Sequence, residues 1–155
     1  MTDSIEVREL PEQYVLGIRM KTDMAGLPSS IGAMYHELFS YLGSKIIPPL
    51  GMPYAEYFEV GEKGIDLECG VAVPPGSKGE GRIVARVIPG TKALHAVHIG
   101  PYETMMGTYT KIDAWIKANG YAYAGNPREI YNSDPQKEKD SSKWLTEIVW
   151  PVRRI

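Results

Sequence analysis

Two stretches with the same apolar spacing decide the fold. They read IGAMYHELFSYL (residues 31–42) and MMGTYTKIDAWI (residues 105–116), and their first residues lie 74 positions apart. In both stretches, apolar or aromatic residues recur at positions i, i+4, i+7 and i+11, which lie on one face of an α-helix. The sequence therefore predicts two related helices in two related halves of the chain.

The segments that follow these helices also repeat. GMPYAEY (residues 51–57) and GNPREIY (residues 125–131) keep Gly, Pro and Tyr at the same offset of 74 residues. Further along, ECGVAV (residues 68–73) parallels EIVWPV (residues 147–152) at an offset of 79, which implies a loop longer by five residues in the second half. Matches in the same order along both halves indicate an internal duplication.

Each half is predicted to fold as strand, helix, strand, strand. In the first half, about residues 5–74, we expect a β-rich run interrupted at Pro11 (5–20), a helix (30–42) and two strands (54–60 and 65–73). In the second half, about residues 82–152, we expect a strand region interrupted at Pro89-Gly90 (82–99), a helix from Pro101 to a stop at Asn119-Gly120, and two strands (129–132 and 144–152). A turn-rich linker (74–81) and a charged, solvated loop (133–143) complete the chain.

Two βαββ halves predict an α+β fold. We expect a single domain over residues 1–155, with an antiparallel sheet on one side and two helices on the other, related by a pseudo-two-fold axis. Because neither half could bury its sheet face alone, the halves are expected to join side by side. Such a seam between helices is a common place for a small-molecule cleft.

The composition excludes several classes of protein. The chain has 155 residues, 17 basic and 19 acidic, with a net charge of −2 and one Cys. A disulfide framework and a Cys-rich zinc site are therefore excluded, and no apolar run approaches the roughly 20 residues that span a bilayer. We expect a cytoplasmic domain without metal, cofactor or membrane contact. The presence of 10 Tyr and 3 Trp against 2 Phe is the first functional hint, because these rings combine an apolar face with a polar group.

Glu147 is the first candidate for a functional residue, because it interrupts the apolar strand 144–152. Side chains alternate along a strand, so Glu147 shares a face with Leu145 and Val149, whereas Trp150 faces the other way. Burial of such a carboxylate is costly unless it is paired. It could instead face solvent or pair with Arg82, Arg86 or Arg128. Since Glu68 occupies the matching position of the first half, the duplication favours a buried anion at the floor of a cleft, suited to a lipophilic cation.

Tyrosines and methionines are the candidate walls of that cleft. The tyrosines that recur between the halves are Tyr35 with Tyr109 on the helices and Tyr57 with Tyr131 on the strands. Core packing with the hydroxyl at the rim is the alternative for each of them. Adaptable apolar surface would come from Met34, Met105 and Met106, for which core packing is again the alternative.

Other chemistry has weak support in the sequence. His95 and His98 lie three apart in a predicted strand, which directs them to opposite faces and argues against a shared metal. The glycines of the linker lack the strand and helix that a phosphate loop needs, and no nucleophile signature is present. Cys69 lies in a β-rich run and is interpreted as buried packing.

Four segments together resemble the GyrI-like family of small-molecule-binding domains, which also serve as effector-binding modules of AraC- and MerR-type multidrug regulators. They are RELP (8–11) with VLGIR (15–19), HIGPYET (98–104), PREIYNSDP (127–135) and LTEIVWPV (145–152). The resemblance covers residues 5–152. It implies a duplicated βαββ fold with a cleft between the halves, in which a buried Glu on the last strand faces cationic aromatic ligands among tyrosines. The matching residues here are Glu147 and Tyr131.

The resemblance implies a stand-alone binding protein for lipophilic, often cationic, aromatic compounds. The chain begins directly with the binding domain, so no direct nucleic-acid binding is expected. One alternative is a hydrolase of cyclopropane-bearing genotoxins that uses the same cleft, with Glu147, raised in pKa, as general base and Tyr131 beside it. A further alternative is a protein-interaction factor of the gyrase-inhibitor type, with gyrase as partner.

Overall fold

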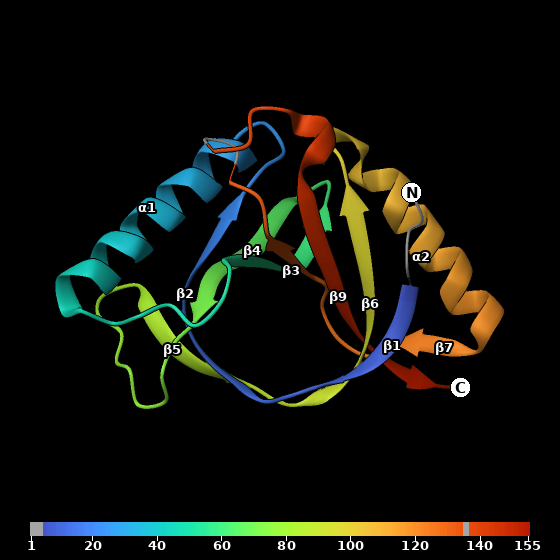
Figure 1. Ribbon diagram of the computed structural model, residues 1–155, viewed down its shortest axis with the longest axis horizontal. Helices are drawn as coiled ribbons and strands as arrows, with labels where there is room; N and C mark the ends of the chain where they lie inside the picture. The colour runs from blue at the N-terminus through green and yellow to red at the C-terminus, as the bar shows by residue number, and fades with distance from the viewer. Residues whose placement is uncertain (1–4, 135–136) are drawn as a thin grey trace. The chain divides into compact units, whose positions relative to one another are not determined.

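The computed structural model describes residues 5–134 and 137–155 (Figure 1). Over these residues the chain forms nine β-strands, two α-helices and two short 3₁₀ helices, and it divides into two compact units. The 11–90 unit comprises Pro11–Gly90, and the 91–155 unit comprises Thr91–Ile155 together with the strand Ile5–Leu10. Strand pairing inside both units is antiparallel, which confirms the predicted α+β class.

The 11–90 unit is a four-stranded sheet with one helix. Its strands lie in the order β5-β2-β4-β3, with bounds β2 Gln13–Thr22, β3 Tyr54–Gly61, β4 Gly64–Ala72 and β5 Ile83–Ile88. Helix α1 (Leu27–Lys45) contacts β2 and β4 and buries Met34, Leu38 and Leu42, of which Leu38 and Leu42 belong to the predicted apolar face. Alternation along β2 supplies the facing core residues Leu16 and Ile18.

The 91–155 unit repeats this plan. Strands β1, β6, β9 and β8 lie in that order, and β7 pairs with the end of β9. Their bounds are β1 Ile5–Leu10, β6 Thr91–Ile99, β7 Tyr121–Tyr123, β8 Arg128–Tyr131 and β9 Leu145–Arg154. Helix α2 (Met105–Asn119) packs Ile112 and Ile116 on Leu94 of β6 and Ile148 of β9. It ends as predicted at Gly120, whose φ of 74° is left-handed and favours glycine.

Three local features differ from the predicted elements. Helix α2 does not start at Pro101, because a 3₁₀ helix, η1 (Tyr102–Thr104), precedes it. A second 3₁₀ helix, η2 (Ser141–Lys143), forms inside the predicted loop 133–143, of which residues 135–136 lie outside the described residues. The two predicted β-rich runs do break at Pro11 and at Pro89-Gly90. The first strand of each run pairs within the other unit: β1 pairs with β6, and β5 pairs with β2. Such pairings join segments far apart in the sequence, so local patterns do not reveal them.

The strand registers of the two units bear out the duplication. Glu68 lies opposite Arg19 on β2, and Glu147 lies opposite Val97 at the corresponding place on β6. On the other side of each carboxylate strand, the matching pairs are Tyr57 with Leu67 and Tyr131 with Thr146. The second of these pairs encloses five more residues than the first, as the two sequence offsets predict. Glu68 and Glu147 are therefore equivalent positions of a repeated fold.

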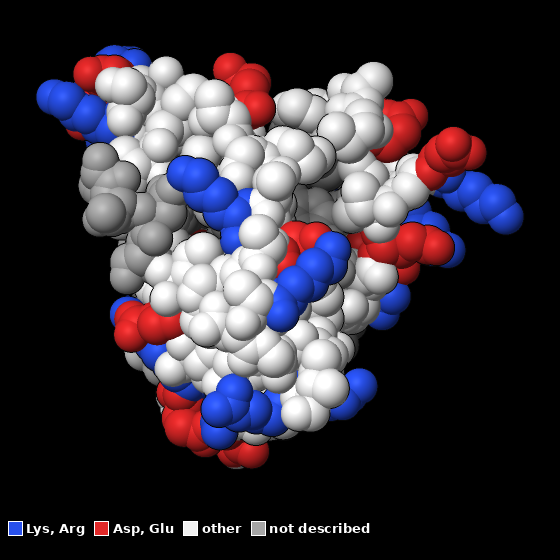
Figure 2. Space-filling view, turned by 90° about the vertical axis from the view of Figure 1, so that its right-hand side faces the viewer, with Lys and Arg blue, Asp and Glu red and all other residues white. Residues whose placement is uncertain are grey.

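The face drawn in Figure 2 carries charges of both signs, with Lys and Arg side chains interspersed among Asp and Glu. Mixed charges of this kind are typical of a solvent-facing surface. Among the described residues, no helix is both long and apolar enough to cross a membrane.

Candidate functional site

A carboxylate between two tyrosines lies on the helix-facing side of the 91–155 unit. Tyr131 and Glu129 pair with Thr146 and Ile148 of β9, and Ile148 packs against helix α2. Because paired residues share a face, the Glu129 and Tyr131 side chains also point to the side of α2. The Tyr109 hydroxyl donates to Glu129 Oε2 at 2.6 Å, and the Tyr131 hydroxyl donates to Glu129 Oε1 at 2.8 Å.

Further aromatic rings pack against the two tyrosines that bind this carboxylate. Trp150 lies edge-on to Tyr109, with ring centroids 6.0 Å apart, and stacks on Tyr123 at 4.1 Å. Tyr102 of η1 lies 5.8 Å from Tyr131 and 5.0 Å from Trp144. We call this set the aromatic cluster: Glu129, Tyr102, Tyr109, Tyr123, Tyr131, Trp144 and Trp150. Most of its rings are half-buried, and Tyr102 is the more exposed outer ring.

Glu129 has no cationic partner among the residues that the structure describes. Within the described part of the chain, both oxygens of Glu129 accept hydrogen bonds from neutral hydroxyls and neither forms an ion pair. Burial raises the pKa of Tyr102, and the negative charges of Glu129 and Asp134 raise it further. The cluster therefore combines a half-buried carboxylate with neighbouring aromatic rings, and both groups attract a cation.

Glu147 lies on the opposite face of the same sheet. His95 Nε2 contacts Glu147 Oε1 at 2.7 Å, and Asn132 Nδ2 donates to Glu147 Oε2 at 2.6 Å. Burial favours the neutral acid, but the hydrogen bonds from His95 and Asn132 outweigh it, so the pKa of Glu147 is lowered. The structure thus separates Glu147 from Tyr109 and Tyr131, and its hydrogen-bond partners are His95 and Asn132 rather than an arginine. His98 points to the other face, as its spacing from His95 predicts.

Glu68, the equivalent residue of the 11–90 unit, is an internal ion-pair partner. Arg86 of β5 donates from Nη2 to Glu68 Oε1 at 2.5 Å and to Glu56 Oε1 at 2.8 Å, and the Tyr54 hydroxyl donates to Glu68 at 2.8 Å. Gly17 makes room for the carboxylate, because a Cβ at this position would lie 2.9 Å from Glu68. Both Glu68 oxygens are thus engaged within the unit.

Residues 3–153 match the family of GyrI-like small molecule binding domains. The chain belongs to this family. A search of the curated proteins finds no match. The GyrI-like domain is similar over its whole length to the crystal structure of the EcmrR C-terminal domain, with 30% identity, complete coverage of both chains and a TM-score of 0.79.

Further solved structures share the fold. In the cryo-EM structure of an EcmrR–DNA complex, the matching chain is 28% identical with a TM-score of 0.80; the match covers 99% of the GyrI-like domain and 58% of the EcmrR chain. A hydrolase from Listeria innocua is 17% identical, with coverage of 97% and 92% and a TM-score of 0.68. SAV2435, solved bound to tetraphenylphosphonium, is 12% identical, with coverage of 97% and 94% and a TM-score of 0.63.

The other predicted wall residues of the GyrI-like domain lie within the separate units, away from Glu129 or in the cores. Tyr35 donates its hydroxyl to the Tyr54 carbonyl oxygen, burial raises the pKa of Tyr35, and Tyr57 lies nearby on the same side of the sheet as α1. Met34 is fully buried under α1, and Met105 belongs to the core that contains Ile112. These two methionines pack the cores of their units, whereas Tyr109, Tyr131 and Trp150 are brought together at Glu129.

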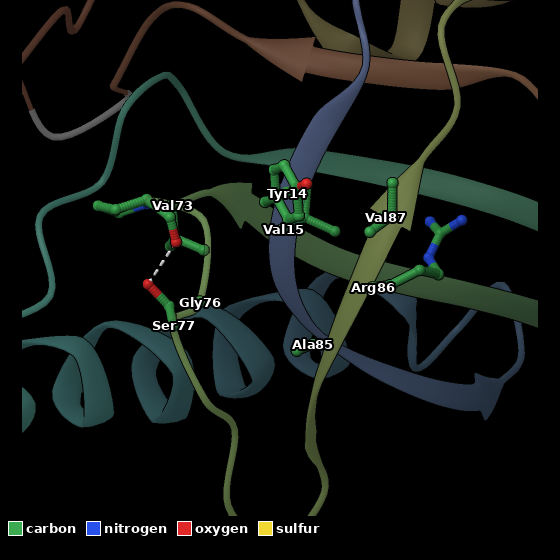
Figure 3. Close-up of a pocket in the computed structure, with 9 residues that line it drawn as sticks. Tyr14, Val15, Val73, Gly76, Ser77, Ala85, Arg86 and Val87 are labelled. Carbon is green, nitrogen blue, oxygen red and sulfur yellow. Dashed lines mark hydrogen bonds between the residues drawn. The ribbon is translucent and has the colours of Figure 1, made fainter.

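A small pocket of about 220 Å³ lies elsewhere, in the 11–90 unit. Figure 3 shows it at the edge strand β5, between the Val73 and Ser77 segment and the side chains of Tyr14 and Val87. The Ser77 hydroxyl closes the turn at its rim by donating to the Pro74 carbonyl oxygen at 2.7 Å. Its lining shares no residue with the aromatic cluster. Among the described residues, no three His, Cys, Asp or Glu side chains are grouped closely enough to hold a metal.

Glu129 is the functional candidate that the sequence interpretation missed. A signal for it was present in the segment PREIY, where Glu129 precedes Tyr131 by two residues. Residues two apart on a strand share a face, so this spacing places the carboxylate beside the tyrosine. The same rule places Glu147 with Val149, away from Trp150.

Proposed function

We propose that this GyrI-like domain binds lipophilic organic cations that carry aromatic groups, and that Glu129 of the aromatic cluster supplies the opposing charge. The observation that carries the proposal is the half-buried Glu129, whose oxygens are held by the Tyr109 and Tyr131 hydroxyls and by no cation in the described residues. This site replaces Glu147 as the anion in our proposal, because Glu147 is already bonded to His95 on the other face.

The energetics favour a cation over a neutral ligand. At an effective dielectric constant of about 20, a cation about 6 Å from the carboxylate gains roughly 2–3 kcal/mol. Contact with the faces of Tyr or Trp adds about 0.5–2 kcal/mol. The tyrosine hydroxyls keep the carboxylate in place before the ligand arrives, which reduces the ordering cost of binding.

The family supports the proposal in a general way. Its members are small-molecule-binding domains, and the same fold in SAV2435 was solved with the lipophilic cation tetraphenylphosphonium. Identity to SAV2435 is 12%, so the similarity concerns the fold, and the ligand class rests on Glu129.

Binding without turnover is the expected activity. The hydrolase hypothesis requires Glu147 as a base of raised pKa, whereas its bonds to His95 and Asn132 lower that pKa and make it a weaker base. We therefore expect a bound ligand to be recovered intact after long incubation with excess protein.

Isothermal titration with tetraphenylphosphonium tests the proposal. Glu129→Gln keeps the shape of the side chain and removes its charge, so it should weaken binding roughly tenfold to hundredfold. Glu147→Gln is the matched control on the opposite face and should bind like the wild type. Triphenylphosphine oxide, a neutral ligand of similar shape, should bind equally to the wild type and to Glu129→Gln. Equal affinity of Glu129→Gln and the wild type for the cation would overturn the proposal.

A further inference from the structure

His98 of β6 contacts three residues at the start of helix α2. It is buried, and its Nδ1 lies 2.6 Å from Thr108 Oγ1. Its Nε2 lies 3.1 Å from the Pro101 carbonyl oxygen and 3.1 Å from Thr104 Oγ1. These partners lie just before η1, at its end and in the first turns of α2. One imidazole therefore contacts both ends of the 3₁₀ helix.

The partners define the tautomer of His98. A carbonyl oxygen only accepts, so the contact with Pro101 requires that Nε2 carries the hydrogen. Nδ1 then accepts from the Thr108 hydroxyl. Thr104 also donates to the Pro101 carbonyl oxygen, from Oγ1 at 2.7 Å and from its backbone N–H at 3.1 Å. The imidazole thus completes a closed set of hydrogen bonds around one carbonyl group.

The turn that His98 holds carries Tyr102 of the aromatic cluster. Tyr102 lies between Pro101 and Thr104, and its ring lies edge-on to Tyr131, whose hydroxyl donates to Glu129. Tyr102 makes no hydrogen bond to His98 in the described structure, so the imidazole acts on it through the backbone of η1. Loss of the His98 contact to Pro101 would free this backbone and the ring above Tyr131.

We infer that His98 is a positioning residue, which does not touch the ligand and which sets cation affinity by holding Tyr102 over the Glu129 site. The inference rests on the proposed function. A ring contact contributes about 1 kcal/mol, so release of Tyr102 should weaken binding about fivefold.

Hydrogen exchange tests the positioning step without any ligand. His98→Asn places its amide near the position of Nδ1 and loses the contact to Pro101, whereas the longer His98→Gln can still donate to the Pro101 carbonyl oxygen. In His98→Asn, exchange of the Thr104 amide should accelerate about tenfold or more, while the β6 and β9 amides around Val149 keep their protection. His98→Gln should lie close to the wild type. Unchanged Thr104 exchange in His98→Asn, or equal acceleration at Val149, would overturn the inference.

A double-mutant cycle tests the link to binding. With tetraphenylphosphonium, His98→Asn and Tyr102→Ala should each weaken affinity about fivefold. The double variant should bind no more weakly than the single variant that binds less tightly. Independent, multiplying effects would show that His98 does not act through Tyr102 and would overturn the inference. If the wild-type protein fails to bind the cation, the proposed function is rejected, and the exchange measurement still decides whether His98 positions the turn.

Discussion

Removal of the Arg86 charge should strongly destabilise the 11–90 unit. Arg86 is the cationic partner of Glu68, at 2.5 Å, and of Glu56, at 2.8 Å, and the side chain of Glu68 is only 7% exposed. Arg86→Met keeps most of the apolar stem and leaves Glu68 with the Tyr54 hydroxyl as its remaining partner. The variant therefore removes the cation that both buried carboxylates share.

The magnitude follows from the burial of the pair. Removing one partner of a buried ion pair costs about 3–5 kcal/mol. The Arg86 side chain is 32% exposed, so water reaches the site, and we expect a loss of about 2–4 kcal/mol in the free energy of unfolding. For a chain of this size the loss corresponds to a decrease of about 5–12 °C in Tm, measured by circular dichroism.

Two further variants separate the charge effect from lost packing. Arg86→Met combined with Glu68→Gln should recover much of the loss, because the buried charge is removed as well. Arg82→Met is the matched control, since both side chains of the Arg82–Glu37 pair are exposed and its loss should change the stability little. If Arg86→Met costs no more than Arg82→Met, or if Glu68→Gln gives no recovery, the reasoning is refuted.

Three other perturbations give distinct expectations in urea unfolding. Gly17→Ala would place a Cβ 2.9 Å from the Glu68 carboxylate, and the crowding should cost about 1–3 kcal/mol; an unchanged unfolding midpoint would contradict it. The lowered pKa of Glu147 adds stability that is fully present above its ordinary value of 4.5 and is lost as the pH falls through the lower folded value. The advantage of wild type over Glu147→Gln should therefore shrink as the pH falls below 4.5; a difference that stays constant below pH 4.5 would count against this. Met34→Ala, at a fully buried site, should lower the free energy of unfolding by about 2–5 kcal/mol, whereas Met106→Ala, at a 74% exposed site, should lower it little. The cation affinity of Met34→Ala should be unchanged.

Repetition made much of the fold predictable. The helical spacing at 31–42 and 105–116 identifies both helices, and the shift from an offset of 74 to one of 79 predicts the longer connection between β8 and β9. The equivalence of Glu68 and Glu147 follows from the same alignment and appears in the strand registers. These features depend on local periodicity, which a single sequence displays directly.

The environments of the two aligned carboxylates could not be predicted in the same way. Glu68 is paired with Arg86, which lies 18 residues away on a strand that the sequence assigned to the other half. Glu147 is bonded to His95, 52 residues away. Both partners depend on strand pairing, which a local pattern does not specify. For Glu129 the local signal existed in its spacing from Tyr131. The sequence interpretation instead chose Glu147, whose side chain lies on the opposite face of the sheet.

The position of a bound cation is the most direct test of the central claim, that Glu129 anchors the ligand. Tetraphenylarsonium has nearly the shape of tetraphenylphosphonium, and its arsenic gives an anomalous signal in a crystal of the complex. We predict one strong arsenic peak beside the Glu129 carboxylate, among the rings of Tyr102, Tyr109, Tyr131 and Trp150. A peak beside Glu147 and His95, or in the pocket between Tyr14 and Val87, with none at Glu129, would contradict the account.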